Sequence, residues 1–184
     1  MIVKYRTDNY PYKVYTALLT QSGGDDFQYG VGFPLIIGRT YTFDNSLSGD
    51  NFSNVGGPNI TVDNSYDGYS FVATGTTPIS WSGGSTLTWN TGAPVVTVLE
   101  NTIGNVWFTY GSTGQYNLYS NETFSYNKVF CQGYSISEDG ANFKVTSVFW
   151  STPNQIVIST TRPIDSLNYD DILSNTPIEI RVYN

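Results

Sequence analysis

From Ala93 to its last residue, the chain alternates short runs of β-branched and aromatic residues with turns that carry Gly, Asn or Pro. This pattern is typical of antiparallel sheets, because neighbouring strands then need only a tight turn between them. We therefore predict an all-β fold, an antiparallel β-sandwich of jelly-roll-like or immunoglobulin-like type. The predicted strands of this half are 95–99, 106–110, 115–119, 128–134, 143–150, 155–160 and 178–183.

In the first half of the chain, the residue composition changes at Phe27 and again at Gly92. Two strands are predicted before Phe27, at 2–6 and 13–20, and a Ser-Gly-Gly-Asp-Asp turn follows the second. Between Phe27 and Gly92, Gly, Asn, Ser and Thr become denser and the apolar runs shorten. The strands predicted there are 33–43, 60–62, 69–73, 79–81 and 86–89.

Two local expectations concern the end of the chain. The segment 164–175 is the one predicted helix, with Asp165 or Ser166 as its N-cap and Pro177 just beyond its end. The strands 2–6 and 178–183 both carry alternating charges, which suits edge strands. We expect these two strands to pair with each other or across subunits.

Composition excludes several classes of function. Charged residues make up only 12% of the chain, aromatic residues 16%, and the net charge is −7. The eight basic residues are scattered, so nucleic-acid binding is not expected. The chain has no histidine, which removes the commonest general base and zinc ligand, and we expect no metal and no cofactor. The single cysteine, Cys131, is predicted to be a small core residue.

The sequence also bears on where the protein is found. The first residues lack the basic start and apolar run of a signal peptide, and no segment is apolar enough to span a membrane. We therefore expect synthesis in a host cytoplasm and no membrane partner.

The acidic residues suggest no catalytic site. Glu100 lies at the end of a predicted strand, where a carboxylate can accept backbone hydrogen bonds, and no second carboxylate is nominated as its partner. The stretch from Asp63 to Gly68 resembles the start of a calcium loop, but its twelfth position is Thr74 instead of Glu. We predict no catalytic residue, and we interpret these acids as structural.

Aromatic residues are the candidates for ligand contact. Trp81 and Trp89 flank a Ser-Gly-Gly-Ser turn on a predicted hairpin, and they could stack on a sugar together with Tyr69. The alternative is that they pack within the hairpin. Trp107 and Trp150 lie in regular strands and are predicted to be core or interface residues.

Three stretches resemble segments that recur in virion structural proteins of bacteriophages and related viruses. They are KVYTALLTQSGG (13–24), APVVTVLENTIGNVWFTYGSTGQY (93–116) and the run that begins GDNFSNVGG (49–87). In such proteins an LLTQSG-like strand leads almost directly into an APV-TVLENT-G-like strand. The resemblance implies that 27–92 is an inserted, projecting β subdomain and that 1–26 plus 93–184 form a discontinuous core domain.

The resemblance also implies a function. We expect a non-enzymatic virion protein, such as a capsid-associated spike, head fibre or decoration protein, that assembles with other virion proteins. A homo-oligomer is expected, with a trimer as the working guess. The alternative is a receptor- or carbohydrate-binding module of a tail fibre or spike, with the insert presenting aromatic residues to a host-surface glycan. A third alternative, a polysaccharide depolymerase, would need paired carboxylates.

Overall fold

The computed structural model describes residues 11–21, 27–29, 33–60, 65–82, 84–89, 91–121, 124–133, 145–162, 166–170 and 172–184. Regular structure within these ranges is almost all β-strand, arranged in three antiparallel sheets, which confirms the predicted all-β class. The exceptions are two 3₁₀ turns, η1 (Ser53–Val55) and η2 (Tyr126–Lys128). Neither these nor any other helix in the described ranges has the length and apolarity to cross a membrane.

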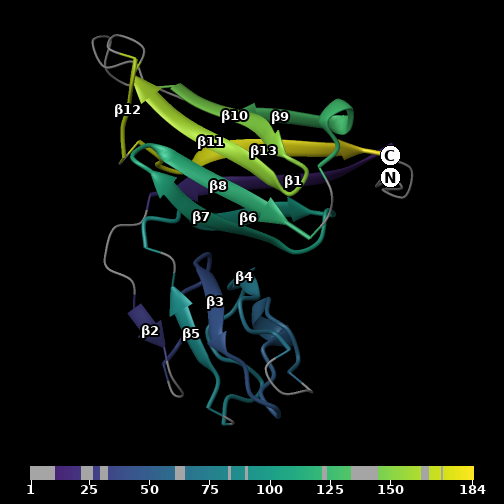
Figure 1. Cartoon of the computed structure of the whole chain (residues 1–184), viewed down its shortest axis with the longest axis vertical. Helices are drawn as coiled ribbons and strands as arrows, with labels where there is room; N and C mark the ends of the chain where they lie inside the picture. Colours follow the sequence, from purple (N-terminus) through teal and green to yellow (C-terminus); the bar gives the residue numbers. More distant parts are fainter. Residues whose placement is uncertain are drawn as a thin grey trace, which may run out of the picture.

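Two of the sheets pack face to face as a sandwich (Figure 1). The first sheet has the strand order β6-β1-β13-β9, and the second has the order β10-β11-β8-β7, with the short β12 paired to β11. In the first sheet the strands are β6 (Val95–Asn101), β1 (Tyr12–Thr20), β13 (Thr176–Tyr183) and β9 (Val129–Gly133). In the second they are β10 (Val145–Thr152), β11 (Gln155–Arg162), β8 (Gln115–Ser120), β7 (Val106–Ser112) and β12 (Leu167–Asn168).

The sandwich core follows from the two-residue alternation of these strands. Every second residue of a strand faces the same side, so the apolar residues at alternate positions meet between the sheets. The buried core side chains of the main strands are Tyr15, Ala17, Leu19, Val96, Val106, Phe108, Tyr116, Leu118, Ile156, Ile158, Ile178 and Ile180.

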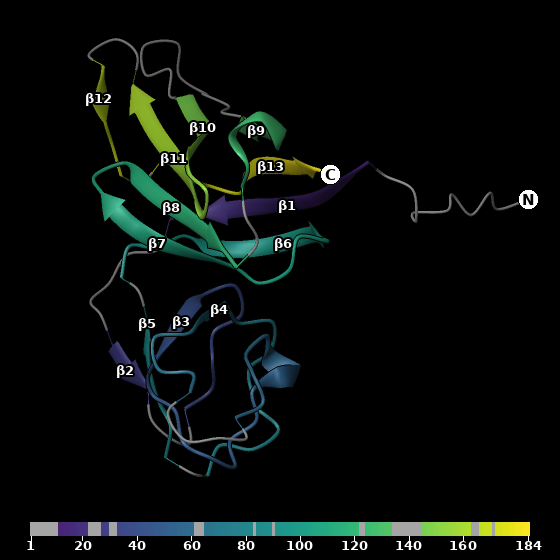
Figure 2. The same cartoon turned by 45° about the vertical axis from the view of Figure 1, so that its right-hand side comes forward.

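The third sheet is smaller and has its own aromatic core. Its order is β2-β5-β3-β4, and it lies below the sandwich in both views (Figures 1 and 2). The ring of Phe52 packs edge-on against Phe43 at 5.0 Å, and Phe71 lies 5.8 Å from Phe43. The strands are β2 (Phe27–Tyr29), β5 (Thr86–Trp89), β3 (Thr40–Asn45) and β4 (Ser70–Val72).

Hydrogen bonds tie this small unit to the sandwich. The backbone N–H of Val96 donates to the carbonyl of Gly38 at 2.8 Å. The N–H of Phe108 donates to the buried hydroxyl of Thr40 at 3.1 Å, and Val72 of β4 belongs to the sandwich core. The strands of the small sheet all fall within 27–92, while the predicted division into an insert and a discontinuous core domain stays a prediction.

The predicted strands after Ala93 are confirmed, with ends that differ by about two residues. In the first half, β1 and β5 lie where they were predicted. The predicted strand 33–43 is wrong in its first part, because regular pairing begins at Thr40. The predicted strand 79–81 is reduced to an isolated bridge between Ser80 and Asn51. The predicted strand 2–6 lies outside the described residues.

The predicted helix at 164–175 is wrong. Its described residues contain β12, which pairs with β11, and no helix. The hydroxyl of Thr161 donates to the Asn168 side chain at 3.1 Å, and the hydroxyl of Thr160 donates to the Tyr169 carbonyl at 2.6 Å. Side-chain partners on a neighbouring strand thus overrode a weak local helix signal.

The prediction that 178–183 is an edge strand is also wrong. The strand β13 lies in the middle of its sheet, between β1 and β9. Its alternating charges face outward: Arg181 forms an ion pair with Glu179 and lies 5.1 Å from the ring of Tyr12. The alternation therefore marks the solvent-facing side of a central strand whose other side buries Ile178 and Ile180.

Candidate functional site

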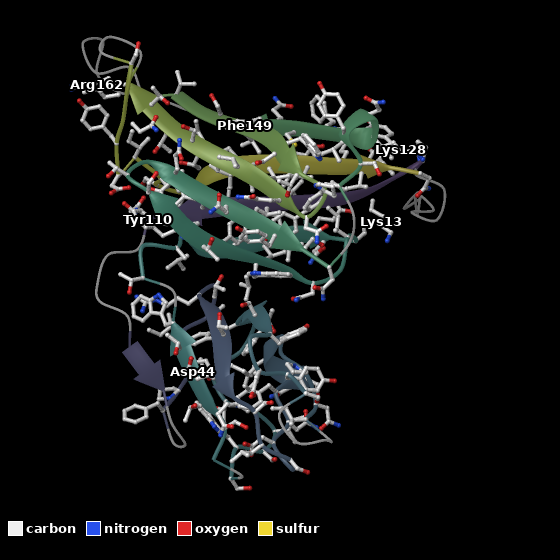
Figure 3. All side chains as sticks on the ribbon, in the orientation of Figure 1. Lys13, Asp44, Tyr110, Lys128, Phe149 and Arg162 are labelled. Atoms are coloured by element: carbon white, nitrogen blue, oxygen red, sulfur yellow. The ribbon has the colours of Figure 1, made fainter. Side chains whose placement is uncertain are left out.

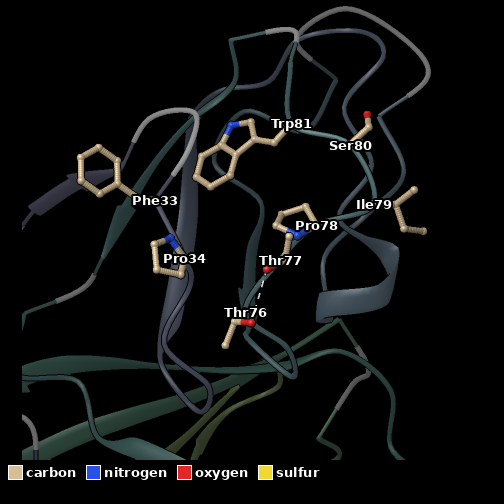
Figure 4. Close-up of a pocket in the computed structure, with 8 residues that line it drawn as sticks. All are labelled: Phe33, Pro34, Thr76, Thr77, Pro78, Ile79, Ser80 and Trp81. Carbon is tan, nitrogen blue, oxygen red and sulfur yellow. Dashed lines mark hydrogen bonds between the residues drawn. The ribbon is translucent and has the colours of Figure 1, made fainter.

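A pocket of about 320 Å³ opens on the small unit. Phe33 and Pro34 form one wall, and the segment from Thr76 to Trp81 forms the other (Figure 4). The two walls are joined where the N–H of Leu35 donates to the carbonyl of Thr76 at 2.8 Å. None of the described residues that line it is charged. We call it the Trp81 pocket.

Neighbouring side chains hold the second wall in place. The amide of Asn54 donates to the carbonyl of Thr77 at 2.9 Å and accepts from the N–H of Ile79 at 3.0 Å. The hydroxyl of Ser80 donates to the carbonyl of Gly49 at 2.5 Å. The irregular backbone of this wall is therefore fixed by specific hydrogen bonds, so the pocket is preformed.

Trp81 is held by the loop that follows it. Its indole N–H donates to the carbonyl of Ser85 at 2.8 Å, and its ring packs against Phe52 at 5.2 Å. The fully buried carboxylate of Asp50 accepts from the N–H groups of Ser82 and Ser85, at 2.8 and 3.1 Å. The half-buried Trp81 is therefore a fixed part of the pocket wall.

The three aromatic residues nominated from sequence do not form one platform. Trp89 is only 8% exposed, and the guanidinium of Arg39 lies 3.1 Å from the centre of its ring. Tyr69 lines a different pocket, between the small unit and the sandwich. Of these three aromatic residues, only Trp81 lines the Trp81 pocket.

Sequence reasoning missed the most exposed apolar residues at this pocket. Phe33 is 54% exposed and Ile79 is 63% exposed, and Ile36 and Ile37 near Phe33 are also exposed. A strand over 33–43 would have buried alternate residues of this run. Because 33–39 lies outside regular strands, the run Phe-Pro-Leu-Ile-Ile instead buries Leu35 and exposes its neighbours.

The other candidate residues have structural surroundings. Glu100 is exposed on β6, opposite Thr16 of β1. The carboxylate of Asp67 accepts from both the N–H and the hydroxyl of Ser46, and Asp63 lies outside the described residues. Among the side chains that the structure describes, no three His, Cys, Asp or Glu gather closely enough to hold a metal ion.

The sandwich carries the remaining candidates. Cys131 is half-buried against the core, and burial raises the pKa of its thiol to about 11. Trp107 stacks on Tyr119 at 5.8 Å, and Trp150 donates to the carbonyl of Phe124 at 2.6 Å. The basic residues labelled on the sandwich are spread over it, since Arg162 lies at the opposite end from Lys13 and Lys128 (Figure 3).

Comparisons with known protein families, with curated proteins and with solved structures find no match to this chain. The chemistry of the site must therefore be argued from its residues. The Trp81 pocket offers aromatic, proline and aliphatic surface, and its lining contains neither a titratable acid nor a base. Such a surface can bury an uncharged group of a partner.

Proposed function

We propose that this chain is a non-enzymatic structural protein of a virus particle, such as a capsid-associated spike, head fibre or decoration protein. It acts by contact with other virion proteins and with copies of itself. The observation that carries the proposal is the uncharged Trp81 pocket with Phe33 and Ile79 exposed on its walls. The resemblance of 13–24 and 93–116 to virion proteins supports the same assignment.

The chemistry of protein interfaces explains why this surface favours assembly. The centres of interfaces are poor in charged residues and rich in aromatic ones. Exposed apolar patches on folded proteins mark contact sites. Two exposed apolar side chains, Phe33 and Ile79, lie on the walls of the Trp81 pocket, and Ile36 and Ile37 are exposed in the segment that follows Pro34.

Mass spectrometry of purified particles tests the proposal. The chain is expected in the particle at a fixed copy number, and Ile79→Asp is expected to lower that number at least tenfold, because a charge would be buried in the contact. Leu167→Asp is the matched control, since Leu167 is also an exposed apolar residue but lies on β12 of the sandwich. Absence of the chain from the particles would refute the proposal.

A receptor- or carbohydrate-binding role is the second candidate. It is favoured by Trp81, whose half-buried ring lines an open pocket and is held in a fixed position. Titration of tryptophan fluorescence with host-surface polysaccharide is expected to give a saturable change. Trp81→Ala is expected to abolish it while the circular dichroism spectrum stays unchanged. A linear, non-saturating response would contradict this role.

A further inference from the structure

The second sheet of the sandwich turns one side toward the core and the other side away from it. Along β7, β8, β10 and β11, buried residues alternate with exposed or partly exposed ones, and the latter share the outer side. The register places these outward residues next to one another on neighbouring strands. We call this side the Asn117 face. It is formed by Trp107, Thr109, Asn117, Tyr119, Ser147, Phe149, Gln155 and Val157.

The Asn117 face carries no charged residue. In the four main strands of this sheet, all of them described, the one charged residue is Arg162, at the last position of β11. The outer side of the first sheet differs, because Glu179 and Arg181 form an ion pair there. Residues that stay in contact with water are commonly charged, whereas the centres of protein interfaces are poor in charge. The composition of the Asn117 face is therefore that of a surface covered by a partner.

Aromatic side chains lie at two separate places on this face. On β7 and β8, the ring of Trp107 stacks on that of Tyr119, with an angle of 20° between their planes. On β10, the side chain of Phe149 is 46% exposed and lies beside Val157 of β11 (Figure 3). Aromatic rings contribute much of the binding free energy of interfaces, because each buries a large apolar area. The face thus has two apolar patches, one over β7 and β8 and one over β10 and β11.

Between these patches the face carries neutral amide and hydroxyl groups. The amide of Gln155 donates to the side-chain oxygen of Asn117 at 2.7 Å, and the amide of Asn117 donates to the hydroxyl of Thr109 at 3.4 Å. This polar row fixes three side chains across β11, β8 and β7, so little side-chain entropy is lost when a partner covers them. Each amide keeps further donor and acceptor positions, which a partner with amide and hydroxyl groups can use.

Charge favours a second copy of the chain as that partner. Each copy has a net charge of −7, so two copies repel each other where their charged surfaces approach. At the Asn117 face two copies meet without bringing like charges together. The face also complements itself, because amide and hydroxyl groups both donate to and accept from identical groups.

We propose that two copies of the chain associate through their Asn117 faces, about a two-fold axis that runs along the strands between β8 and β11. This axis places β10 of each copy over β7 of the other, so that Phe149 of one copy lies toward Trp107 of the other and the two polar rows meet at the centre. The inference rests on the assembly function proposed above and adds the surface that the copies share.

The size of the face sets the strength of the contact. Four strands of about seven residues span roughly 20 Å in each direction. Two such faces bury roughly 1,000 Å² in total, which is the low end of the range for specific interfaces. A reversible dimer with a Kd in the micromolar range is therefore expected.

Sedimentation equilibrium of the full chain, at about 1 to 200 μM, tests the proposal, because weak dimers form within this range. The mean mass is expected to rise from that of a monomer to that of a dimer. A mass that stays monomeric at every concentration would overturn the proposal, and so would a trimer, which a single two-fold contact cannot form.

Two pairs of variants assign the contact to this face. Asn117→Asp places two carboxylates near the axis and is expected to raise the dimer Kd at least tenfold. Asn184→Asp adds the same charge at the exposed end of the chain, after β13, and is expected to leave the Kd unchanged. Phe149→Ala is expected to raise the Kd about fivefold or more. Its control is Phe130→Ala, which removes an exposed ring from β9 of the first sheet. Circular dichroism confirms that each variant folds.

The remaining outcomes separate this inference from the proposed function. If a dimer forms but Asn117→Asp and Phe149→Ala leave its Kd unchanged, the copies associate through another face and the inference is wrong. If the chain is monomeric yet present in virus particles, the inference fails while the assembly function stands. If the chain is monomeric and host polysaccharide shifts the amide resonances of Asn117 and Tyr119, the face binds a glycan instead. If the dimer forms through this face but particles lack the chain, the assembly function fails alone.

Discussion

At the scale of single residues, two buried or half-buried carboxylates in the loops, those of Asp50 and Asp170, accept hydrogen bonds from backbone N–H groups. Asp50 accepts from the N–H groups of Ser82 and Ser85. Asp170 accepts from the N–H of Gly114 at 2.8 Å and from the hydroxyl of Tyr110 at 2.9 Å. A carboxylate bound to backbone N–H groups stabilises an irregular loop strongly, because charged hydrogen bonds exceed neutral ones. This accounts for acidic residues in the loops of a chain whose Trp81 pocket is uncharged.

The thiol of Cys131 provides a prediction at this scale. Burial disfavours the thiolate, so the thiol stays protonated until the pH approaches its raised pKa of about 11. At pH 8 about 0.1% is thiolate, against roughly a quarter for a free cysteine. Alkylation by iodoacetamide is expected to be about two-hundredfold slower in the folded chain than in urea, and its rate in the folded chain is expected to rise about tenfold per pH unit. Equal rates would contradict the burial of Cys131.

At the scale of elements, Gly38 joins the small unit to β6. It has a positive φ of 85°, and its carbonyl accepts from the N–H of Val96. A Cβ at this position would overlap the carbonyl oxygen of Val96. The chain therefore needs glycine here for two reasons, the backbone conformation and the close approach of β6.

Replacing Gly38 tests this junction. Gly38→Ala is expected to cost about 3 kcal/mol of unfolding free energy, measured by urea denaturation, because strain and overlap both act. Gly49→Ala is the matched control: its φ is 97°, but no atom lies within 4 Å of the added Cβ. Strain alone is expected to cost about 1 kcal/mol there. Equal costs would show that the contact with β6 contributes nothing.

At the scale of the whole molecule, the chain contacts the sandwich both where it leaves β1 for the small unit and where it returns to β6. Gln21, just after β1, accepts from the hydroxyl of Tyr116 on β8. Gly92, just before β6, lies so close to the ring of Tyr110 that a Cβ there would approach it to 2.8 Å. The hydroxyl of Tyr110 donates to Asp170 at 2.9 Å, and the hydroxyl of Tyr116 lies 3.4 Å from the same carboxylate. The two tyrosines that contact Gln21 and Gly92 thus meet at one carboxylate of the sandwich.

This coupling predicts a single unfolding transition. Calorimetry is expected to give one peak whose calorimetric and van't Hoff enthalpies agree. Thr40→Val leaves the buried N–H of Phe108 unpaired, so it is expected to cost about 1–3 kcal/mol and to shift the whole peak. Thr97→Val, at an exposed position on β6, is expected to shift it little. Two separate peaks would contradict the coupling of the units.

The candidate site was only partly predictable. Trp81 was predicted to stack on a ligand because it flanks a strong turn sequence, Ser-Gly-Gly-Ser; the structure places it in the lining of a pocket, and the stacking role stays a prediction. Trp89 could not be distinguished from Trp81 by the local sequence, and its burial and the position of Arg39 over its ring mark it as a core residue. The exposed Phe33 and Ile79 gave no signal, since apolar residues ordinarily predict burial.

The sequence alone determined the all-β class and most strands after Ala93, because alternate burial is a local property that a two-residue period reveals. Tertiary structure decided the rest. It placed β13 at the centre of its sheet, since its partners β1 and β9 are distant in the chain. It also paired Leu167 and Asn168 with β11 in place of the predicted helix. It also placed β4 of the small unit against β7 of the sandwich, two strands that are far apart in the chain.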